Sequence, residues 1–550
     1  MRTASMIVAA LLSVVPAHAQ DKVAEVDKIF SWITPGSPGC AVAVAHNGKP
    51  VVSRAYGLAD LERDVPVRPD TVFDAASVVK QFVAAATLLL VEEGKLSLTE
   101  DVRTYVPELP DYGHKITLDH LLTHTSGLRD WTGIQRLTNG SADALTLTLR
   151  QRGLNFAPGE EWSYSNSGYV LLKEIVGRVS GVSFSEFLRQ RIFEPLGMKN
   201  SRYLVDMRDV VKNRALAYER AGNGWRLDMH FGNERGGGGA LLSTTGDLVL
   251  WNEALTSGRL GTFVTREIAE PATLNNGRKI GYARGLFLDS NRGGQVIWHS
   301  GGSAGYGTFL VRFPEQALSV ATMCNAGETA TGGSYARRIF DIFVPPASTP
   351  GPAAASTPKP AAPAVEGLDL KGRAGLFFNE RTGEPFRLGL DSGRLRVQGG
   401  PVLETLAPDR FRNPRGALQF MSNDEFELRF LSDNRIELTS SEGQKTHYRR
   451  AEPYAPSAAD LQAFAGRYQS DEVGAFFDIA PGKDGLLGRA NDAPGPPLPL
   501  RAVDRDTFQL AGVFVRFRRD PAGKVVALDY SNPLIRRIEF VRVNDHPKGR

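Results

Sequence analysis

Cysteine is scarce in this chain of 550 residues, which contains only Cys40 and Cys324. Two cysteines cannot define a fold through a disulfide framework, so hydrophobic cores must hold the protein together. Both lie in strand-like runs, at 39–45 and 318–325. Two buried thiols are the expected arrangement, and a single bridge in an oxidising compartment is the alternative.

Long hydrophobic runs and blocks of positive charge are also missing. No stretch is long enough to span a bilayer as a helix, so we expect no membrane span. The net charge is only +4, and there is neither a long Lys/Arg run nor an aromatic-basic module, which argues against a nucleic-acid partner. No phosphate-binding glycine loop occurs, and no cofactor or metal is expected.

The first nineteen residues have the pattern of a signal peptide. Arg2 gives a basic start, 6–15 is a short apolar run, and Ala17-His18-Ala19 has the small-x-small form of a cleavage site. Residues 1–19 are therefore predicted to be removed, which indicates a periplasmic or secreted protein.

A tract rich in Pro, Ala, Ser and Thr divides the chain and predicts an extended linker at 345–365. The region before it, 20–344, mixes strands and helices. After it, Ala374-Gly375-Leu376-Phe377 is repeated as Ala465-Gly466-Arg467-Tyr468. This repeat predicts two small antiparallel β-barrel modules, at 366–454 and 455–546.

The region 20–344 has strand-like runs at both ends and helical runs between them. An Asn47-Gly48 turn signal joins the first two strands. One antiparallel sheet built from both ends of the region and flanked by helices is therefore expected, an α/β (α+β) fold. The runs expected to be strands are 39–45, 51–57, 295–299, 308–313 and 318–324, and those expected to be helices are 77–93, 168–180 and 184–192.

Ser77-Val78-Val79-Lys80 opens the apolar helix expected at 77–93, which Gly94 ends. The spacing places a hydroxyl and an amine one turn apart on one face. The positive helix end and partial burial favour a neutral Lys80 that can accept the proton of Ser77. An ordinary exposed pair is the alternative for this motif alone.

Two later motifs carry further catalytic groups. In Tyr164-Ser165-Asn166, the phenol near a lysine amine is expected to have a lowered pKa, and Asn166 in an extended loop would hold a substrate carbonyl. In His299-Ser300-Gly301-Gly302, at the end of a strand, the imidazole donates toward tyrosine or substrate. The glycines there let backbone N–H groups approach an oxyanion.

A Ser-x-x-Lys on a helix, then Tyr-x-Asn, then His-x-Gly on a late strand resembles the ordered motifs of penicillin-recognising serine hydrolases. That family includes class C β-lactamases, D-alanyl-D-alanine carboxypeptidases, D-aminopeptidases and esterases. The resemblance implies a β-lactamase/transpeptidase-like domain followed by lipocalin-like β-barrels, as in D-aminopeptidases.

The same resemblance implies the residue roles. Ser77 is the nucleophile, Lys80 and Tyr164 share proton transfer, and Asn166 and His299 with Gly301 hold the substrate. The oxyanion hole is formed by the N–H groups of Ser77 and Gly302. A small peptide, amide or ester is the implied substrate.

His299 stands where class C β-lactamases carry a lysine, so efficient β-lactam hydrolysis is not expected. The last module of D-aminopeptidases sends a loop to the active site, and 488–495 is the matching segment. There Asn491 and Asp492 are expected to line or gate the pocket, with Asp492 a partner for a substrate ammonium. An ordinary surface turn is the alternative.

Two other patterns point elsewhere and are rejected. Ser303 lies in a Gly-x-Ser-x-Gly segment, but a strand follows it where a nucleophile elbow requires a helix. His120 and His124 have helical zinc spacing but lack the accompanying glutamate, so they are expected to be framework residues. A catalytically idle binding or sensor protein, a β-lactamase or a carboxylesterase are the alternatives to an amide-cleaving hydrolase.

Overall fold

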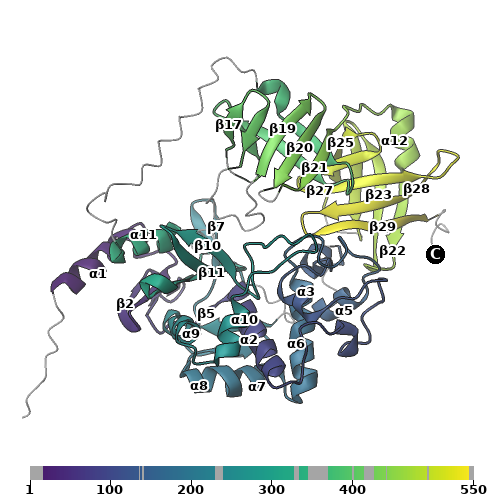
Figure 1. Ribbon diagram of the computed structural model, residues 1–550. Coiled ribbons are helices and arrows are strands. Elements are labelled where there is room, and N and C mark those ends of the chain that lie inside the picture. Colours follow the sequence, from purple (N-terminus) through teal and green to yellow (C-terminus); the bar gives the residue numbers. More distant parts are fainter. Residues whose placement is uncertain are drawn as a thin grey trace, which may run out of the picture.

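The computed structural model describes residues 17–135, 137–138, 142–229, 239–326, 334–344, 370–398, 400, 402–413, 426–440, 443–491 and 495–543. The predicted linker 345–365 and most of the predicted signal peptide lie outside these residues. Figure 1 shows a domain of helices and sheet with two β modules packed side by side against it. Among the described residues, no helix has both the length and the apolar character needed to cross a bilayer.

The central sheet of the first domain is built from both of its ends, as predicted. Its hydrogen-bonded order is β10-β11-β12-β13-β1-β2. Asn47 and Gly48, both with positive φ, form the turn of the β1–β2 hairpin. The strands are β1 (Cys40–His46), β2 (Lys49–Tyr56), β10 (Phe287–Asn291), β11 (Gly294–Ser303), β12 (Tyr306–Phe313) and β13 (Leu318–Cys324).

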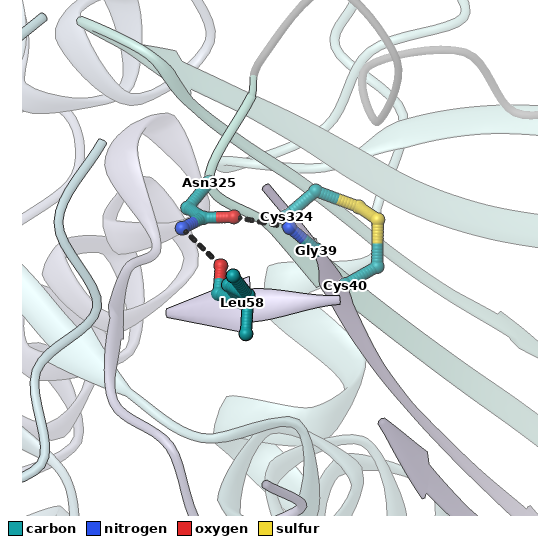
Figure 2. The surroundings of a disulfide bond; sticks show 5 residues. All are labelled: Gly39, Cys40, Leu58, Cys324 and Asn325. Carbon is teal, nitrogen blue, oxygen red and sulfur yellow. Dashed lines mark hydrogen bonds between the residues drawn. A yellow bond between two sulfur atoms is a disulfide. The ribbon is translucent and has the colours of Figure 1, made fainter. Parts of the chain in front are cut away.

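A disulfide joins the first and last strands of this domain. Strand pairing places Cys40 directly opposite Cys324, with their Cα atoms 4.0 Å apart, and the two sulfurs are bonded (Figure 2). The expectation of two buried thiols is therefore wrong, because it depended on a strand register that the sequence alone does not show. Asn325 secures the same corner: its side chain accepts from the Gly39 N–H at 2.7 Å and donates to the Leu58 carbonyl at 3.0 Å.

Helices cover the sheet, and the most buried of them carries the Ser-x-x-Lys motif. A 3₁₀ turn (Ala76–Val78) leads into α2, whose Phe82 stacks on Trp251 of α9 at 4.1 Å. Gly94, at φ +69°, follows the end of α2 as predicted. The helices are α1 (Ala17–Ile29), α2 (Val79–Glu92), α3 (Leu118–Leu122), α4 (Trp131–Gln135), α5 (Ala144–Leu149), α6 (Asn166–Ser180), α7 (Phe184–Leu188), α8 (Glu194–Leu196), α9 (Thr245–Ser257), α10 (Thr262–Ile268) and α11 (Ser334–Phe343).

Short strands complete this domain, and one of them, β5, directly precedes the turn that leads into α2. β5 pairs with β9, which also pairs with β6. The remaining strands form two-stranded ribbons. The bounds are β3 (Leu58–Asp60), β4 (Val65–Pro66), β5 (Phe73–Asp74), β6 (Arg202–Leu204), β7 (Tyr218–Ala221), β8 (Gly224–Leu227) and β9 (Ala240–Ser243).

The two predicted β modules are present and differ in closure. In the described residues, the first is an eight-stranded sheet, in the order β16-β15-β14-β21-β20-β19-β18-β17, whose end strands do not pair with each other. It is a half-barrel around Phe377 and Phe411. Its strands are β14 (Gly375–Asn379), β15 (Pro385–Asp391), β16 (Arg394–Val397), β17 (Glu404–Ala407), β18 (Arg410–Arg412), β19 (Phe426–Ser432), β20 (Arg435–Ser440) and β21 (Lys445–Arg450).

The second module is a closed eight-stranded barrel. Its entry helix, α12 (Ala458–Phe464), ends with Phe464 packed against Phe517 inside the barrel. The strands are β22 (Gly466–Ser470), β23 (Ala475–Gly482), β24 (Gly485–Ala490), β25 (Leu498–Asp504), β26 (Thr507–Leu510), β27 (Val513–Arg519), β28 (Val525–Asn532) and β29 (Ile535–Val543).

Candidate active site

The nucleophile candidate and its base lie together at the start of α2. Lys80 is only 4% exposed, and its Nζ lies 3.3 Å from the Oγ of half-buried Ser77. Burial lowers the pKa of Lys80 to about 7, although the nearby Asp130 carboxylate acts in the opposite direction. A substantial fraction of the amine is therefore neutral near pH 7 and able to accept a proton.

The backbone before Ser77 turns sharply in a way that the sequence did not reveal. Ala76 has a φ of +48°, a left-handed conformation that costs a non-glycine residue free energy. Two hydrogen bonds hold it there: the Ala76 N–H donates to Asp74 Oδ1 at 2.7 Å, and the Ala75 N–H donates to the Leu241 carbonyl at 2.8 Å. Burial raises the pKa of Asp74 to about 6. The turn presents Ser77 at the head of the helix.

Asn166 connects Lys80 to a buried carboxylate. Its Oδ1 accepts from Lys80 Nζ at 2.9 Å, while its Nδ2 and backbone N–H both donate to Asp130 Oδ2 at 2.8 Å. Thr132 donates to the other oxygen of Asp130 through its N–H and its hydroxyl, each at 2.8 Å. Asp130 thereby orients the amide so that its oxygen faces the amine.

Asn166 lies in a different local structure from the one expected. It opens α6 rather than lying in an extended loop, because its backbone N–H is already bound by Asp130. Its side-chain oxygen contacts Lys80, so the role of holding a substrate carbonyl stays a prediction. Asp130 itself was missed, since it belongs to none of the three motifs.

Tyr164 lies close to Lys80, but its pKa moves opposite to the expected direction. Lys80 Nζ lies 4.8 Å from the centre of the buried phenol ring. Burial raises the pKa of Tyr164 well above its usual value, and a hydrogen bond with Ser77 offsets only part of that effect. The expectation of a lowered pKa is wrong because the loss of hydration on burial dominates the shift. Tyr164 is therefore protonated at neutral pH.

His124 supports the loop that carries Tyr164. Its Nδ1 accepts from the Ser165 N–H at 3.1 Å, its carbonyl accepts from the Ser163 N–H at 3.0 Å, and its ring lies 4.3 Å from that of Tyr164. His120 instead belongs to the N-terminal cap of α3. Both are framework residues, as predicted. Within the described parts of the chain, no group of three His, Cys, Asp or Glu side chains is placed to hold a metal ion.

His299 lies on β11 and is completely buried. Its Nδ1 donates to the Ser300 carbonyl at 2.6 Å, which leaves Nε2 as the acceptor, 3.5 Å from the Tyr282 hydroxyl. Burial and the nearby Lys80 lower the pKa of His299 to about 3. The imidazole is therefore neutral at pH 7 and carries no charge for a substrate carboxylate.

The glycines after His299 allow β11 to approach the nucleophile. A Cβ on Gly301 would lie 2.3 Å from the Ala75 carbonyl oxygen, so only glycine fits beside the turn that precedes Ser77. Gly302 is exposed at the end of the strand. Ser303 follows it in the β11–β12 hairpin, which rules out a strand-to-helix elbow at Ser303.

The second β module contacts the loops behind the site. Arg129, next to Asp130, forms an ion pair with Glu472, and both side chains are only 7% exposed. Asn491, predicted to gate the pocket, donates from its side chain to the Leu137 carbonyl. It therefore touches the first domain, whereas Asp492 lies outside the described residues.

Comparisons with known proteins identify the family and the fold. A family model described as Beta-lactamase matches residues 19–342. Penicillin-binding protein 4* of Bacillus subtilis is 31% identical over 317 residues, which make up 52% of this chain and 68% of that protein. The D-aminopeptidase of Brucella canis is 25% identical over 534 residues, 92% of this chain and 96% of that protein. The structure of FmtA from Staphylococcus aureus covers 61% of this chain and 92% of its own, with 20% identity and a TM-score of 0.51, and supports the fold alone.

Proposed function

Because the chain belongs to the Beta-lactamase family of serine hydrolases, we propose that it forms an acyl-enzyme on Ser77 and cleaves amide, peptide or ester bonds. The observation that carries this proposal is the buried Lys80 amine, 3.3 Å from the Ser77 hydroxyl and with a pKa of about 7. A serine hydroxyl becomes a nucleophile when such a base accepts its proton.

The proposed reaction has two halves. Lys80 takes the Ser77 proton while Oγ attacks the substrate carbonyl, and the N–H groups of Ser77 and Gly302 stabilise the oxyanion. Protonated Tyr164 donates its proton to the leaving group and recovers one from the Lys80 ammonium. Water then attacks the acyl-enzyme, transferring its proton through the same pair, and releases the acid and free Ser77.

The proposed substrates carry a D-amino acid with a free ammonium group. The neutral His299 removes the cation that would bind a β-lactam carboxylate. The match to D-aminopeptidases over nearly the whole chain supports the same preference. Within this proposal the loop at 488–495 gates the pocket, and Asp492 pairs with the substrate ammonium.

Secretion is the second part of the proposal. Residues 1–19 act as a signal peptide, and residues 20–344 form the hydrolase domain, ahead of the linker and two modules. The Cys40–Cys324 disulfide supports an oxidising compartment such as the periplasm.

A hydrolysis panel tests the proposal. D-alanyl p-nitroanilide, its L-isomer, a p-nitrophenyl ester and a chromogenic cephalosporin are compared on the wild type, Ser77→Ala and the control Ser303→Ala. We expect the D-amide to be preferred, Ser77→Ala to be inactive and Ser303→Ala to retain activity. Turnover that survives Ser77→Ala would refute the nucleophile, and preference for the cephalosporin would refute the substrate class.

A further inference from the structure

A cavity of about 750 Å³ lies between the half-barrel and the closed barrel. Its walls come from the β14–β15 turn on one side and from β26, β27 and the β28–β29 hairpin on the other. Seven arginines and three carboxylates line it among the described residues, an excess of four positive charges. Four of these arginines also pair with carboxylates outside the lining: Arg381 and Arg536 with Glu161, Arg449 with Asp504, and Arg518 with Glu539.

The carboxylates of the cavity are already paired. Glu380 binds Arg435 at 2.7 Å, which lies outside the lining. Asp529 binds Arg518 at 3.3 Å. Glu384 forms an ion pair with Arg536. Asp529 also acts on the charge of Arg516, its neighbour across the β27–β28 pair, but forms its ion pair with Arg518.

Three arginines of the lining contact only neutral oxygens within the part of the chain that the structure describes. Arg387 donates to the side chain of Gln509 at 2.6 Å, and Arg516 donates to the Thr507 hydroxyl at 3.2 Å. Arg537 donates to the carbonyl of Thr382. Each guanidinium group has five N–H donors, so most of these donors stay available to a ligand.

One of these three groups also lies against an aromatic ring. Arg516 and Arg449 both lie over the ring of buried Phe378, at 5.3 and 5.6 Å from its centre. Burial and the charges of Arg449 and Arg537 lower the pKa of Arg516, while the carboxylates of Asp504 and Asp529 act in the opposite direction. The N–H donors of a guanidinium group form a planar fork that matches the oxygens of a phosphate or carboxylate.

We propose that this cavity binds a small polyanion that carries phosphate or carboxylate groups, with Arg387, Arg516 and Arg537 as its main ligands. An anion with two or three charges would neutralise the three unpaired guanidinium groups. A ligand bound in this cavity contacts both β modules. Its binding is independent of the hydrolysis proposed at Ser77, because Ser77 lies in another domain.

Calorimetric titration of the full chain at low ionic strength tests this site. Pyrophosphate and a propane tricarboxylate are the probes, applied to the wild type, Arg387→Gln, Arg516→Gln and the control Arg394→Gln. Arg394 is exposed on β16, outside the cavity, and its substitution removes the same charge from the same module as Arg387→Gln. Thermal melting shows which variants fold. If Arg516→Gln does not fold, Arg387→Gln still tests the site.

We expect saturable binding that weakens about tenfold or more in each cavity variant and is unchanged in Arg394→Gln. Binding of pyrophosphate alone assigns the site to phosphates, binding of the tricarboxylate alone to carboxylates, and binding of both to recognition by charge. No saturable binding of either probe would overturn the proposal. Equal weakening in all three variants would also overturn it, because it would show only non-specific attraction.

Discussion

The rate of hydrolysis should follow the fraction of Lys80 that is neutral, because only the free amine can accept the Ser77 proton. With a pKa of about 7, that fraction is about 9% at pH 6, half at pH 7 and about 91% at pH 8. The value of kcat/KM should therefore rise about tenfold from pH 6 to pH 8 and then level off. An ordinary lysine, with a pKa of about 10.4, would give a rise of about 100-fold over the same range with no plateau.

A substitution at Asp130 tests whether Lys80 is the group whose titration produces the acidic limb of the profile. The Asp130 carboxylate raises the pKa of Lys80, so Asp130→Asn should move the acidic limb of the profile to lower pH. Asp111→Asn is the matched control, since Asp111 is exposed and pairs with Arg103 at the surface. The pH at the midpoint of the acidic limb does not depend on the amount of active enzyme, so a partly inactive variant can still be compared.

The profile is measured as kcat/KM in a buffer of constant ionic strength, with stability checked at each pH. A limb that keeps rising to pH 10 would refute the neutral Lys80. A limb that moves upward in Asp130→Asn, or moves equally in Asp111→Asn, would refute the assigned electrostatic coupling.

Three other predictions address the phenol, the disulfide and the contact between domains. Tyr164→Phe keeps the buried ring but removes the proton donor, so kcat should fall by about 10²–10⁴-fold in steady-state assays; an unchanged kcat would exclude the relay. Replacing Cys40 and Cys324 by serine opens a link across 284 residues and should lower the free energy of unfolding by about 2–5 kcal/mol in urea titrations. Glu472→Gln leaves Arg129 buried without its carboxylate and should cost about 3–5 kcal/mol, with Glu472→Asp partly restoring stability; a melting temperature equal to that of the wild type would contradict this.

Much of the site was predictable because its groups follow from local patterns. Ser77 and Lys80 lie at the head of an apolar helix, and His299 ends a short apolar run that forms a buried strand. Short segments of sequence reveal both patterns. The same holds for the central sheet, whose hairpin turn and end strands were predicted from turn residues and β-branched runs.

The remaining features depend on contacts between distant segments. Asp130 lies in a loop without periodicity, and its function appears only when it meets Asn166. The disulfide required the register of two strands far apart in the sequence. The raised pKa of Tyr164 depends on how completely the loop is buried, which the neighbouring residue types do not show.

The open form of the first β module was also not predicted from the sequence pattern. Its repeat with the second module, visible at Phe377 and Tyr468, predicted two similar barrels. The first and last strands pair in both modules, β14 with β21 and β22 with β29. In the described residues, β24 and β25 of the second module also pair, whereas β16 and β17 of the first do not, and this leaves the first module open.

The most direct test of the account is the covalent state of Ser77. Intact-protein mass spectrometry after treatment with a fluorophosphonate, followed by peptide mapping, should show one added group on the peptide that contains Ser77. The group should be absent in Ser77→Ala and present in Ser303→Ala, and labelling should rise with pH through about 7 as Lys80 loses its proton. Labelling at another residue, or none at any pH, would contradict a nucleophilic Ser77 activated by Lys80.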